Sequence, residues 1–372
     1  RALGGLWDNV VSRKLYLTGG IGARREGEAF GDDYELPNRT AYAETCAAIA
    51  NAMWNHRLFL LHGDAKYLDV LERIVYNGVL SGVSLDGERF FYPNPLASDG
   101  ERSFNMGQKG RSAWFDCSCC PTNVVRFLAS MAGYVYAQRE RDVFVNLFVA
   151  GRGELSFDGL TLGIRQETRY PWDGRVRIAL EPGRPAEFAL HVRVPGWAQG
   201  RPVPSDLYRY AEAGTEAFTL AVNGQPVKPE IVQGFAVLRR TWKAGDAIEL
   251  TLPMSVRRVL SHEKVADDSG RVALERGPVV YCAEAVDNGG RAFNLVLPDD
   301  AKLEARERPD LLGGVTVVTG RALALQPTDD GRSVVTREQD FLAVPYHVWA
   351  HRGDGEMAVW LPRRVKLDFL VP

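Results

Sequence analysis

The sequence predicts an α+β multidomain protein, with helices in its first third and β-sandwiches in the remainder. Apolar residues recur at helical spacing as far as about residue 137. From about residue 142 they instead alternate with polar residues in short runs, which is typical of β-strands. A chain of 372 residues is long enough for two or three domains.

Three apolar stripes predict the helices. They comprise Ile49, Ala52, Met53 and Leu61; Leu68, Leu71, Ile74 and Val75; and Val124, Phe127, Leu128, Met131 and Val135. Before the third stripe lies the Gly- and Pro-punctuated segment SLDGERFFYPNPLASDGERSFNMGQKG, and loops of that length are often functional or mobile. The chain has no initiator Met and opens on what resembles the tail of a helix, so we expect a fragment without its N-terminal part.

The second part of the chain has the alternation of a β-sandwich. Its strand-like segments are DVFVNLFV, FALHVRV, FTLAVNG, FAVLRRTW and AIELTLPM, with turn signals such as PWDG and VNGQP between them. A further β segment begins near SVRRVL and includes RVALERGPVVYCAE. The chain closes with VPYHVWAHRGDGEMAVWLPRR, which is again strand-like.

Composition and charge exclude several classes of function. With 45% hydrophobic and 25% charged residues the chain resembles an ordinary globular protein. A net charge of −2 gives no field that would recruit nucleic acid or an anionic membrane, and no apolar stretch approaches the length of a bilayer span. Cysteine usage favours a reducing compartment, with Cys282 expected to be buried. We therefore expect a cytoplasmic protein without nucleic-acid or membrane partners, and we leave homo-oligomer formation open.

The clustered cysteines carry the most information about function. Cys117, Cys119 and Cys120 fall within four positions in WFDCSCCPTN, and Cys46 follows Glu44 by two residues in YAETC. Neighbouring cysteines cannot form a disulfide without severe strain, so a metal held by thiolates is the better interpretation. Zinc is favoured because it takes four sulfur, nitrogen or oxygen ligands in tetrahedral geometry. A closed zinc site with a purely structural role remains an alternative.

Helix geometry restricts the backbone at these residues. On a regular helix Glu44 and Cys46 would point about 200° apart, so a shared metal requires backbone that is non-helical or only entering a helix. Pro121 favours the first position of a helix, which places Cys119 and Cys120 at a helix N-terminus. The helix dipole and the free N–H groups there stabilise a thiolate.

A further carboxylate lies in the turn-rich segment YLTGGIGARREGEAFGDDYELPNRT. Glu28 stands sixteen residues before Glu44, close to Asp32 and Asp33. An acidic loop by itself is usually only a solvated surface. The GGIG portion is a weak match to a phosphate loop because no GK[ST] follows it.

Taken together, the motifs resemble glycoside hydrolase family 127, the β-L-arabinofuranosidase family. They are TGGIG, GEAF, LPN, YAETCA, LERIVYNGVLSGVSLDGERFFYPNPL and WFDCSCCPTNVVR, and the resemblance continues through HVRVPGWA, VALERGPVVYCAE and VPYHVWAHRG. It implies the C-terminal part of an (α/α)6 barrel followed by two β-sandwich domains. The barrel portion would span residues 1–137, the first sandwich 138–255 together with 346–372, and an inserted second sandwich 256–345.

The resemblance also implies the residues of the site. Glu44, Cys46, Cys119 and Cys120 would bind Zn²⁺, Cys119 would be the nucleophile, and Glu28 the acid/base. The implied activity is that of a retaining glycoside hydrolase that releases β-L-arabinofuranose, or a related furanose, from an oligosaccharide or glycan. A thiolate would replace the usual carboxylate nucleophile of such an enzyme.

Substrate contacts are implied at Glu72 and Tyr92, and Cys117 matches a family cysteine that does not bind zinc. The family's substrate-binding histidines would belong to the missing N-terminal part, and none of the six histidines of this chain matches them. Two other functions remain open. One is a non-catalytic glycan-binding protein with a structural zinc site. The other is a thiol redox protein that uses Cys117 and Cys120, and it is disfavoured because a redox pair rarely needs Cys119 between its members.

Overall fold

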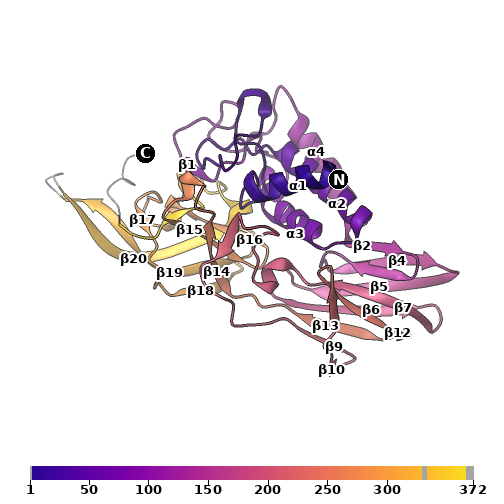
Figure 1. The fold of residues 1–372 in the computed structure, drawn as a ribbon. Coiled ribbons are helices and arrows are strands. Elements are labelled where there is room, and N and C mark those ends of the chain that lie inside the picture. Colours follow the sequence, from indigo (N-terminus) through magenta and orange to yellow (C-terminus); the bar gives the residue numbers. More distant parts are fainter. Residues whose placement is uncertain (1, 329–332, 366–372) are drawn as a thin grey trace.

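Helices occupy the first third of the chain and strands the remainder (Figure 1). The computed structural model describes residues 2–328 and 333–365. Its α-helices are α1 (Ala2–Arg13), α2 (Thr45–His62), α3 (Lys66–Arg73), α4 (Cys119–Ser130) and α5 (Ala132–Val135). Short helical turns include η1 (Glu26–Glu28), η2 (Ile74–Val79), η3 (Leu80–Gly82), η4 (Gly196–Gln199), η5 (Ala266–Asp268), η6 (Ala285–Asp287) and η7 (Tyr346–Val348). The predicted change of period is confirmed, since α5 ends at Val135 and the first strand of the β region begins at Tyr136.

Two sheets form the middle part of the chain. One has the strand order β10-β9-β13-β6-β5-β4 and the other β11-β12-β7-β3-β2. The strands are β2 (Tyr136–Arg139), β3 (Asp142–Val145), β4 (Gly151–Phe157), β5 (Leu160–Thr168), β6 (Arg175–Pro182), β7 (Ala186–Arg193), β9 (Thr219–Val222), β10 (Gln225–Pro226), β11 (Glu230–Val232), β12 (Phe235–Trp242) and β13 (Ala247–Thr251). Neighbouring strands are antiparallel except β3 and β7, which run parallel.

The inner faces of these two sheets pack on each other. Phe157 of β4 meets Phe188 of β7 edge to face, with 5.7 Å between the ring centroids. Trp242 of β12 lies 6.0 Å from Phe188 and is fully buried. The alternation along the strands therefore places one face of each sheet in a shared apolar core.

The last part of the chain forms a third sheet, of eleven strands. Its main path is β17-β19-β20-β16-β15-β14-β8, with β1, β18, β21 and β22 attached at its sides. The strands are β1 (Ala97–Asp99), β8 (Tyr208–Tyr210), β14 (Val256–Ser261), β15 (Arg271–Arg276), β16 (Val279–Glu284), β17 (Leu295–Val296), β18 (Leu303–Arg308), β19 (Val315–Pro327), β20 (Val334–Pro345), β21 (Glu356–Ala358) and β22 (Leu361–Pro362).

The last strands differ from the sequence-based expectation that residues 346–372 return to the first sandwich. Within the described residues, β21 pairs with β16 and with β1, and β22 pairs with β15. Ala358 and Leu361 are buried in the apolar core of this third sheet, which fixes the strands there. Residues 366–372 lie outside the described residues.

Helix α3 joins the helical region to both β regions through two adjacent residues. Glu72 pairs with Arg193 of β7, and Arg73 pairs with Glu275 of β15 at 3.0 Å. All four side chains are almost fully buried. Because buried charges are stable only when paired, these contacts fix how the helices lie on the sheets.

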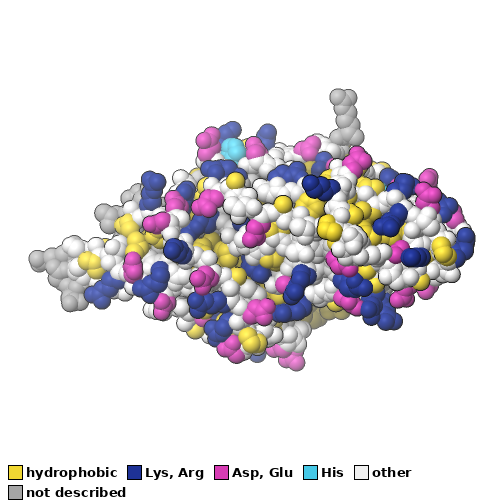
Figure 2. Space-filling view, turned by 90° about the horizontal axis from the view of Figure 1, so that it is seen from below, with side chains coloured by type: hydrophobic (Ala, Val, Ile, Leu, Met, Phe, Trp, Pro, Cys, Tyr) yellow, Lys and Arg dark blue, Asp and Glu magenta, His cyan; other side chains and the backbone are white. Residues whose placement is uncertain are grey.

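The predicted helical stripes are confirmed only in part. Ile49, Ala52 and Phe127 are buried, whereas Leu61 is 67% exposed and Leu128 38%. No helix in the described ranges is long and apolar enough to cross a membrane. Charges of both signs are interspersed on the face seen in Figure 2, in keeping with the small net charge.

Candidate metal centre

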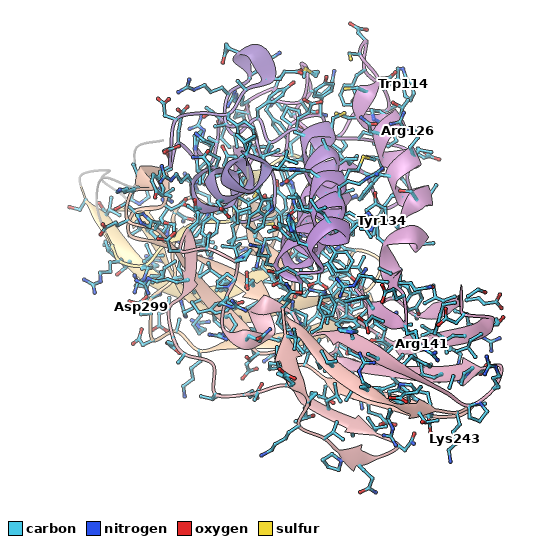
Figure 3. All side chains as sticks on the ribbon, turned by 45° about the vertical axis from the view of Figure 1, so that its right-hand side comes forward. Trp114, Arg126, Tyr134, Arg141, Lys243 and Asp299 are labelled. Carbon is cyan, nitrogen blue, oxygen red and sulfur yellow. The ribbon has the colours of Figure 1, made fainter. Side chains whose placement is uncertain are left out.

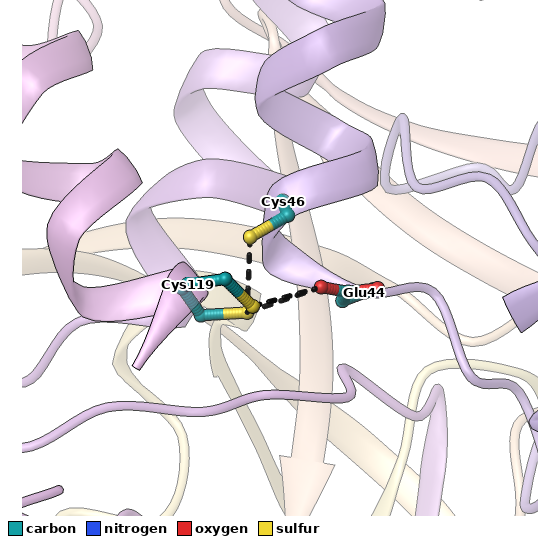
Figure 4. Close-up of side chains that lie close together, drawn as sticks. Glu44, Cys46 and Cys119 are labelled. Atoms are coloured by element: carbon teal, nitrogen blue, oxygen red, sulfur yellow. Dashed lines mark hydrogen bonds between the residues drawn. The ribbon is translucent and has the colours of Figure 1, made fainter. Parts of the chain in front are cut away.

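Two helix N-termini bring four potential metal ligands together (Figure 4). Glu44 is the N-cap of α2, with extended backbone at φ −60° and ψ 141°, and Cys46 is the second residue of that helix. Cys119 and Cys120 are the first two residues of α4. Both predictions about the local backbone are therefore confirmed. Extended backbone at Glu44 lets its side chain turn to the same side as Cys46, which a continuous helix would prevent.

The four ligand atoms all lie within 4.8 Å of one another. Cys120 Sγ is 3.4 Å from Cys46 Sγ and 3.8 Å from Cys119 Sγ. Glu44 Oε1 lies 3.4 Å from Cys120 Sγ and 3.5 Å from Cys119 Sγ. These separations suit donors arranged around one small ion.

The electrostatics of the cluster also fit a cation. Burial raises the pKa of the Glu44 carboxyl and raises the pKa of the Cys119 thiol to about 12. The hydrogen bond with Cys120 lowers the pKa of Cys46, while the same contact raises the pKa of Cys120. The protein alone therefore does not favour several negative charges in this space. A divalent cation would favour them, and three sulfurs with one carboxylate oxygen form a donor set that suits zinc.

Two side chains outside the ligand set contact its sulfurs. Asn123 Nδ2 donates a hydrogen bond of 3.1 Å to Cys46 Sγ, and Tyr92 Oη lies 3.0 Å from Cys119 Sγ. Tyr92, where the resemblance implied a substrate contact, therefore lies beside the cluster. Asn123 was missed in the sequence, although it stands four residues after Cys119 on one helix and therefore shares its face.

Tyr42 connects Glu28 to this cluster. Tyr42 Oη donates a hydrogen bond of 2.9 Å to Glu28 Oε1, and the rings of Tyr42 and Tyr92 pack with centroids 6.2 Å apart. Glu28 lies in η1 with φ 49°, next to Gly27 with φ 71°. The negative charge of Glu28 also contributes to the raised pKa of Glu44. Sequence reasoning gave no sign of Tyr42.

Aromatic side chains pack beside the thiols. Phe115 packs edge to face on Tyr92 with ring centroids 5.5 Å apart, and Phe90 belongs to the same buried cluster. Trp114 is 59% exposed and precedes α4. Figure 3 labels Trp114 and also Arg126, which lies on α4. Cys117 is exposed, with its Sγ 3.9 Å from Tyr92 Oη, and it is not one of the four clustered candidate ligands.

Glu72 requires a correction, since the resemblance implied a sugar contact there. Its side chain is only 1% exposed. Oε1 accepts hydrogen bonds from Arg193 and from Tyr170 Oη, and Oε2 accepts one from Trp197 Nε1 at 3.2 Å. Because both oxygens already have buried protein partners, this carboxylate joins α3 to the β region and has no surface to offer a sugar.

Three family models match the chain in succession. Residues 1–133 match the catalytic domain of β-L-arabinofuranosidase, GH127, and residues 142–254 match the GH127 middle domain. Residues 256–362 match the glycoside hydrolase family 127 C-terminal domain.

Individual relatives agree with these matches. The non-reducing end β-L-arabinofuranosidase of Bifidobacterium longum subsp. longum is 36% identical over 379 residues, which cover 96% of this chain and 54% of the relative. A solved GH127 β-arabinofuranosidase has a TM-score of 0.92 and 47% sequence identity. The match covers 98% of this chain and 56% of the chain in that structure. A GH127 β-L-arabinofuranosidase from Geobacillus stearothermophilus T6 has a TM-score of 0.87 and 42% identity, with coverage of 96% and 55%. The chain thus spans about half the length of the relatives it matches.

Proposed function

The chain belongs to glycoside hydrolase family 127, and on that premise we propose that it is a retaining glycosidase that releases β-L-arabinofuranose, or a related furanose, from arabinofuranose-containing glycans. The observation that carries the proposal is the position of Cys119. Its thiol lies among three other potential ligands and at hydrogen-bond distance from Tyr92, whose ring packs on the tyrosine that holds Glu28. A nucleophile and an acid/base are the two groups that a retaining mechanism requires.

Glu44, Cys46, Cys119 and Cys120 would hold the zinc ion. When bound, zinc supplies positive charge that keeps thiol ligands deprotonated at neutral pH. Asn123 donates to Cys46 Sγ and would fix the orientation of that ligand.

In the first step the lone pair of Cys119 Sγ forms a bond to the anomeric carbon. The bond from that carbon to the leaving oxygen breaks, and this oxygen keeps the electron pair and takes the proton from Glu28. The Tyr92 hydroxyl, 3.0 Å from Sγ, orients the sulfur before the attack.

In the second step Glu28, now a carboxylate, takes a proton from water as the water oxygen attacks the anomeric carbon. The carbon–sulfur bond breaks and its electron pair returns to Cys119. Two displacements at one carbon leave the anomeric configuration unchanged, so the product retains it.

We also propose a domain division on this premise. Residues 1–137 would form part of an (α/α)6 catalytic barrel and residues 138–255 a β-sandwich. The second β-sandwich would begin at 256 and include β21 and β22, because those strands pair with β16 and β15. The boundaries between the matched family domains, at 133–142 and 254–256, support this division.

The experiment is the hydrolysis of 4-nitrophenyl β-L-arabinofuranoside by the zinc-loaded protein, with the first-formed anomer identified by NMR. We expect turnover and a β-configured product. Glu28→Gln should slow substrates with poor leaving groups more than the nitrophenyl substrate, because nitrophenolate needs little protonation. Tight arabinoside binding without turnover would instead identify a glycan-binding protein.

A further inference from the structure

We infer that Tyr42 is a positioning residue for the acid–base step: its hydroxyl holds Oε1 of Glu28 and leaves Oε2 to exchange the proton with the substrate. The inference rests on the proposed function and adds a residue to it. Its basis is the hydrogen bond of 2.9 Å between Tyr42 Oη and Glu28 Oε1.

Tyr42 is itself rigidly held. Its N–H donates to Ala23 O at 3.4 Å, and its carbonyl accepts from the N–H of Asn94 at 3.1 Å. The side chain is buried in the aromatic cluster. Tyr42 also stands two residues before Glu44, so one short non-helical segment carries both a candidate ligand of the cluster and the hydroxyl that holds Glu28.

Glu28, in contrast, is held by little else. It is exposed and lies in a single helical turn, where its N–H donates to Arg25 O at 3.0 Å. In the part of the chain that the structure describes, no side chain other than Tyr42 hydrogen-bonds its carboxylate. An unrestrained glutamate samples several rotamers, so this one contact selects the direction of the carboxyl group.

A second tyrosine acts in the same way on the nucleophile. Tyr92 Oη lies 3.0 Å from Cys119 Sγ, and its ring packs on Tyr42 with centroids 6.2 Å apart. Each proposed reacting group therefore contacts one hydroxyl of a packed tyrosine pair. The pair fixes the position of Glu28 relative to Cys119, and a retaining mechanism depends on that relative position.

The hydroxyl should matter most while the proton is in transfer. As Oε2 gives its proton to the leaving oxygen, negative charge develops on the carboxylate, and a donor at Oε1 stabilises it. Departure of a poor leaving group depends strongly on that proton. An activated aryl leaving group depends on it much less.

The test is Tyr42→Phe, which removes the hydroxyl and keeps the ring. We expect kcat/KM for an arabinofuranosyl disaccharide to fall on the order of 10- to 100-fold, a fraction of the full acid–base contribution. The 4-nitrophenyl substrate should lose no more than about 3-fold, and the zinc content should not change. Tyr208→Phe is the matched control, because it removes another buried hydroxyl with a hydrogen bond of 2.9 Å, to Leu15 O.

Glu28→Asp provides a second test that leaves Tyr42 intact. It draws an exposed carboxyl away from the hydroxyl by one methylene and should give the same dependence on leaving group. In the double variant with Glu28→Gln, Tyr42→Phe should cause no further loss. Equal losses on both substrates, or full activity of Glu28→Asp on the disaccharide, would overturn the inference. An inactive wild-type protein would instead overturn the proposed function.

Discussion

At the scale of single residues, the sulfur of Cys119 combines three contacts. It lies close to Cys120 Sγ, Glu44 Oε1 and Tyr92 Oη, at 3.8, 3.5 and 3.0 Å. Burial raises the pKa of this thiol to about 12 when no cation is present. The reactivity of this thiol at neutral pH would then depend on a cation bound at the cluster.

Cys119→Ser should therefore affect two measurements together. We expect turnover to fall by about 1,000-fold or more, because a hydroxyl is a far weaker nucleophile than a thiolate. Zinc per chain, measured by atomic absorption, should also fall. Cys117→Ser is the control, since Cys117 is exposed and outside the ligand set, and it should keep its zinc. Unchanged zinc content in Cys119→Ser would contradict the ligand assignment.

Asp268 has a buried carboxyl that should make stability depend on pH. Burial raises the pKa of this group from 3.8 to about 8, although Asn38 donates a hydrogen bond of 2.8 Å to it. The pKa of Asp268 is higher in the folded than in the unfolded protein. Its contribution to the free energy of unfolding is therefore complete below about pH 4 and is lost as pH rises towards 8.

Asp268→Asn should remove that dependence. Between pH 5 and pH 8 the wild-type protein should lose on the order of 3 kcal/mol of unfolding free energy relative to the variant. Urea unfolding at the two pH values measures the difference. The exposed neighbour Asp267, changed to Asn, serves as the control. Parallel pH profiles for wild type and Asp268→Asn would show that Asp268 is ionised in the folded protein.

At the scale of elements, α3 is the connection between the three parts of the molecule. Its residues Glu72 and Arg73 each make a buried ion pair with a different sheet, through Arg193 and Glu275. Removing one partner of such a pair leaves the other as an uncompensated buried charge, which is more costly than losing the contact itself.

Glu72→Gln should therefore destabilise the protein without a specific effect on catalysis. We expect a loss of about 3–5 kcal/mol of unfolding free energy, with KM unchanged for the molecules that remain folded. Glu307→Gln breaks an exposed pair with Arg169 and should cost no more than about 1 kcal/mol. If Glu72→Gln instead raised KM and kept full stability, the result would support a sugar contact at Glu72 and contradict the structural role inferred from its burial.

At the scale of the whole molecule, the proposed ion would join two helices far apart in the sequence. Its ligands come from the start of α2 and the start of α4, more than seventy residues apart. An ion bound only by the folded state stabilises that state by mass action, by about 2.7 kcal/mol when its free concentration is 100 times Kd.

Removal of the metal should therefore lower the melting temperature. We expect a chelator to lower the Tm and added Zn²⁺ to restore it, as followed by calorimetry. Cys46→Ala should lose this response, whereas Cys282→Ala, which changes the buried cysteine in β16, should keep it. A Tm that does not respond to the chelator or to zinc would argue against a bound ion.

The sequence determined those features that depend on neighbours along the chain. The change in apolar period placed the helix-to-strand transition within a few residues. Pro121 located the start of α4 to within two residues, and the spacing of Glu44 and Cys46 required the non-helical backbone found at Glu44. The burial of Cys282 also followed from its apolar surroundings. These are local rules, in which the helical or strand period decides the outcome.

Only the tertiary structure decided which distant surfaces meet. Glu72 contacts Tyr170, Arg193 and Trp197, which lie 98 to 125 residues further along the chain. The Tyr42–Glu28 contact joins the helical turn η1 to the segment before α2. Strands β21 and β22 pair with strands of the third sheet and not with the first sandwich. Spacing along the chain does not encode such pairings, because they minimise the exposed apolar surface and the unpaired charge of the whole molecule at once.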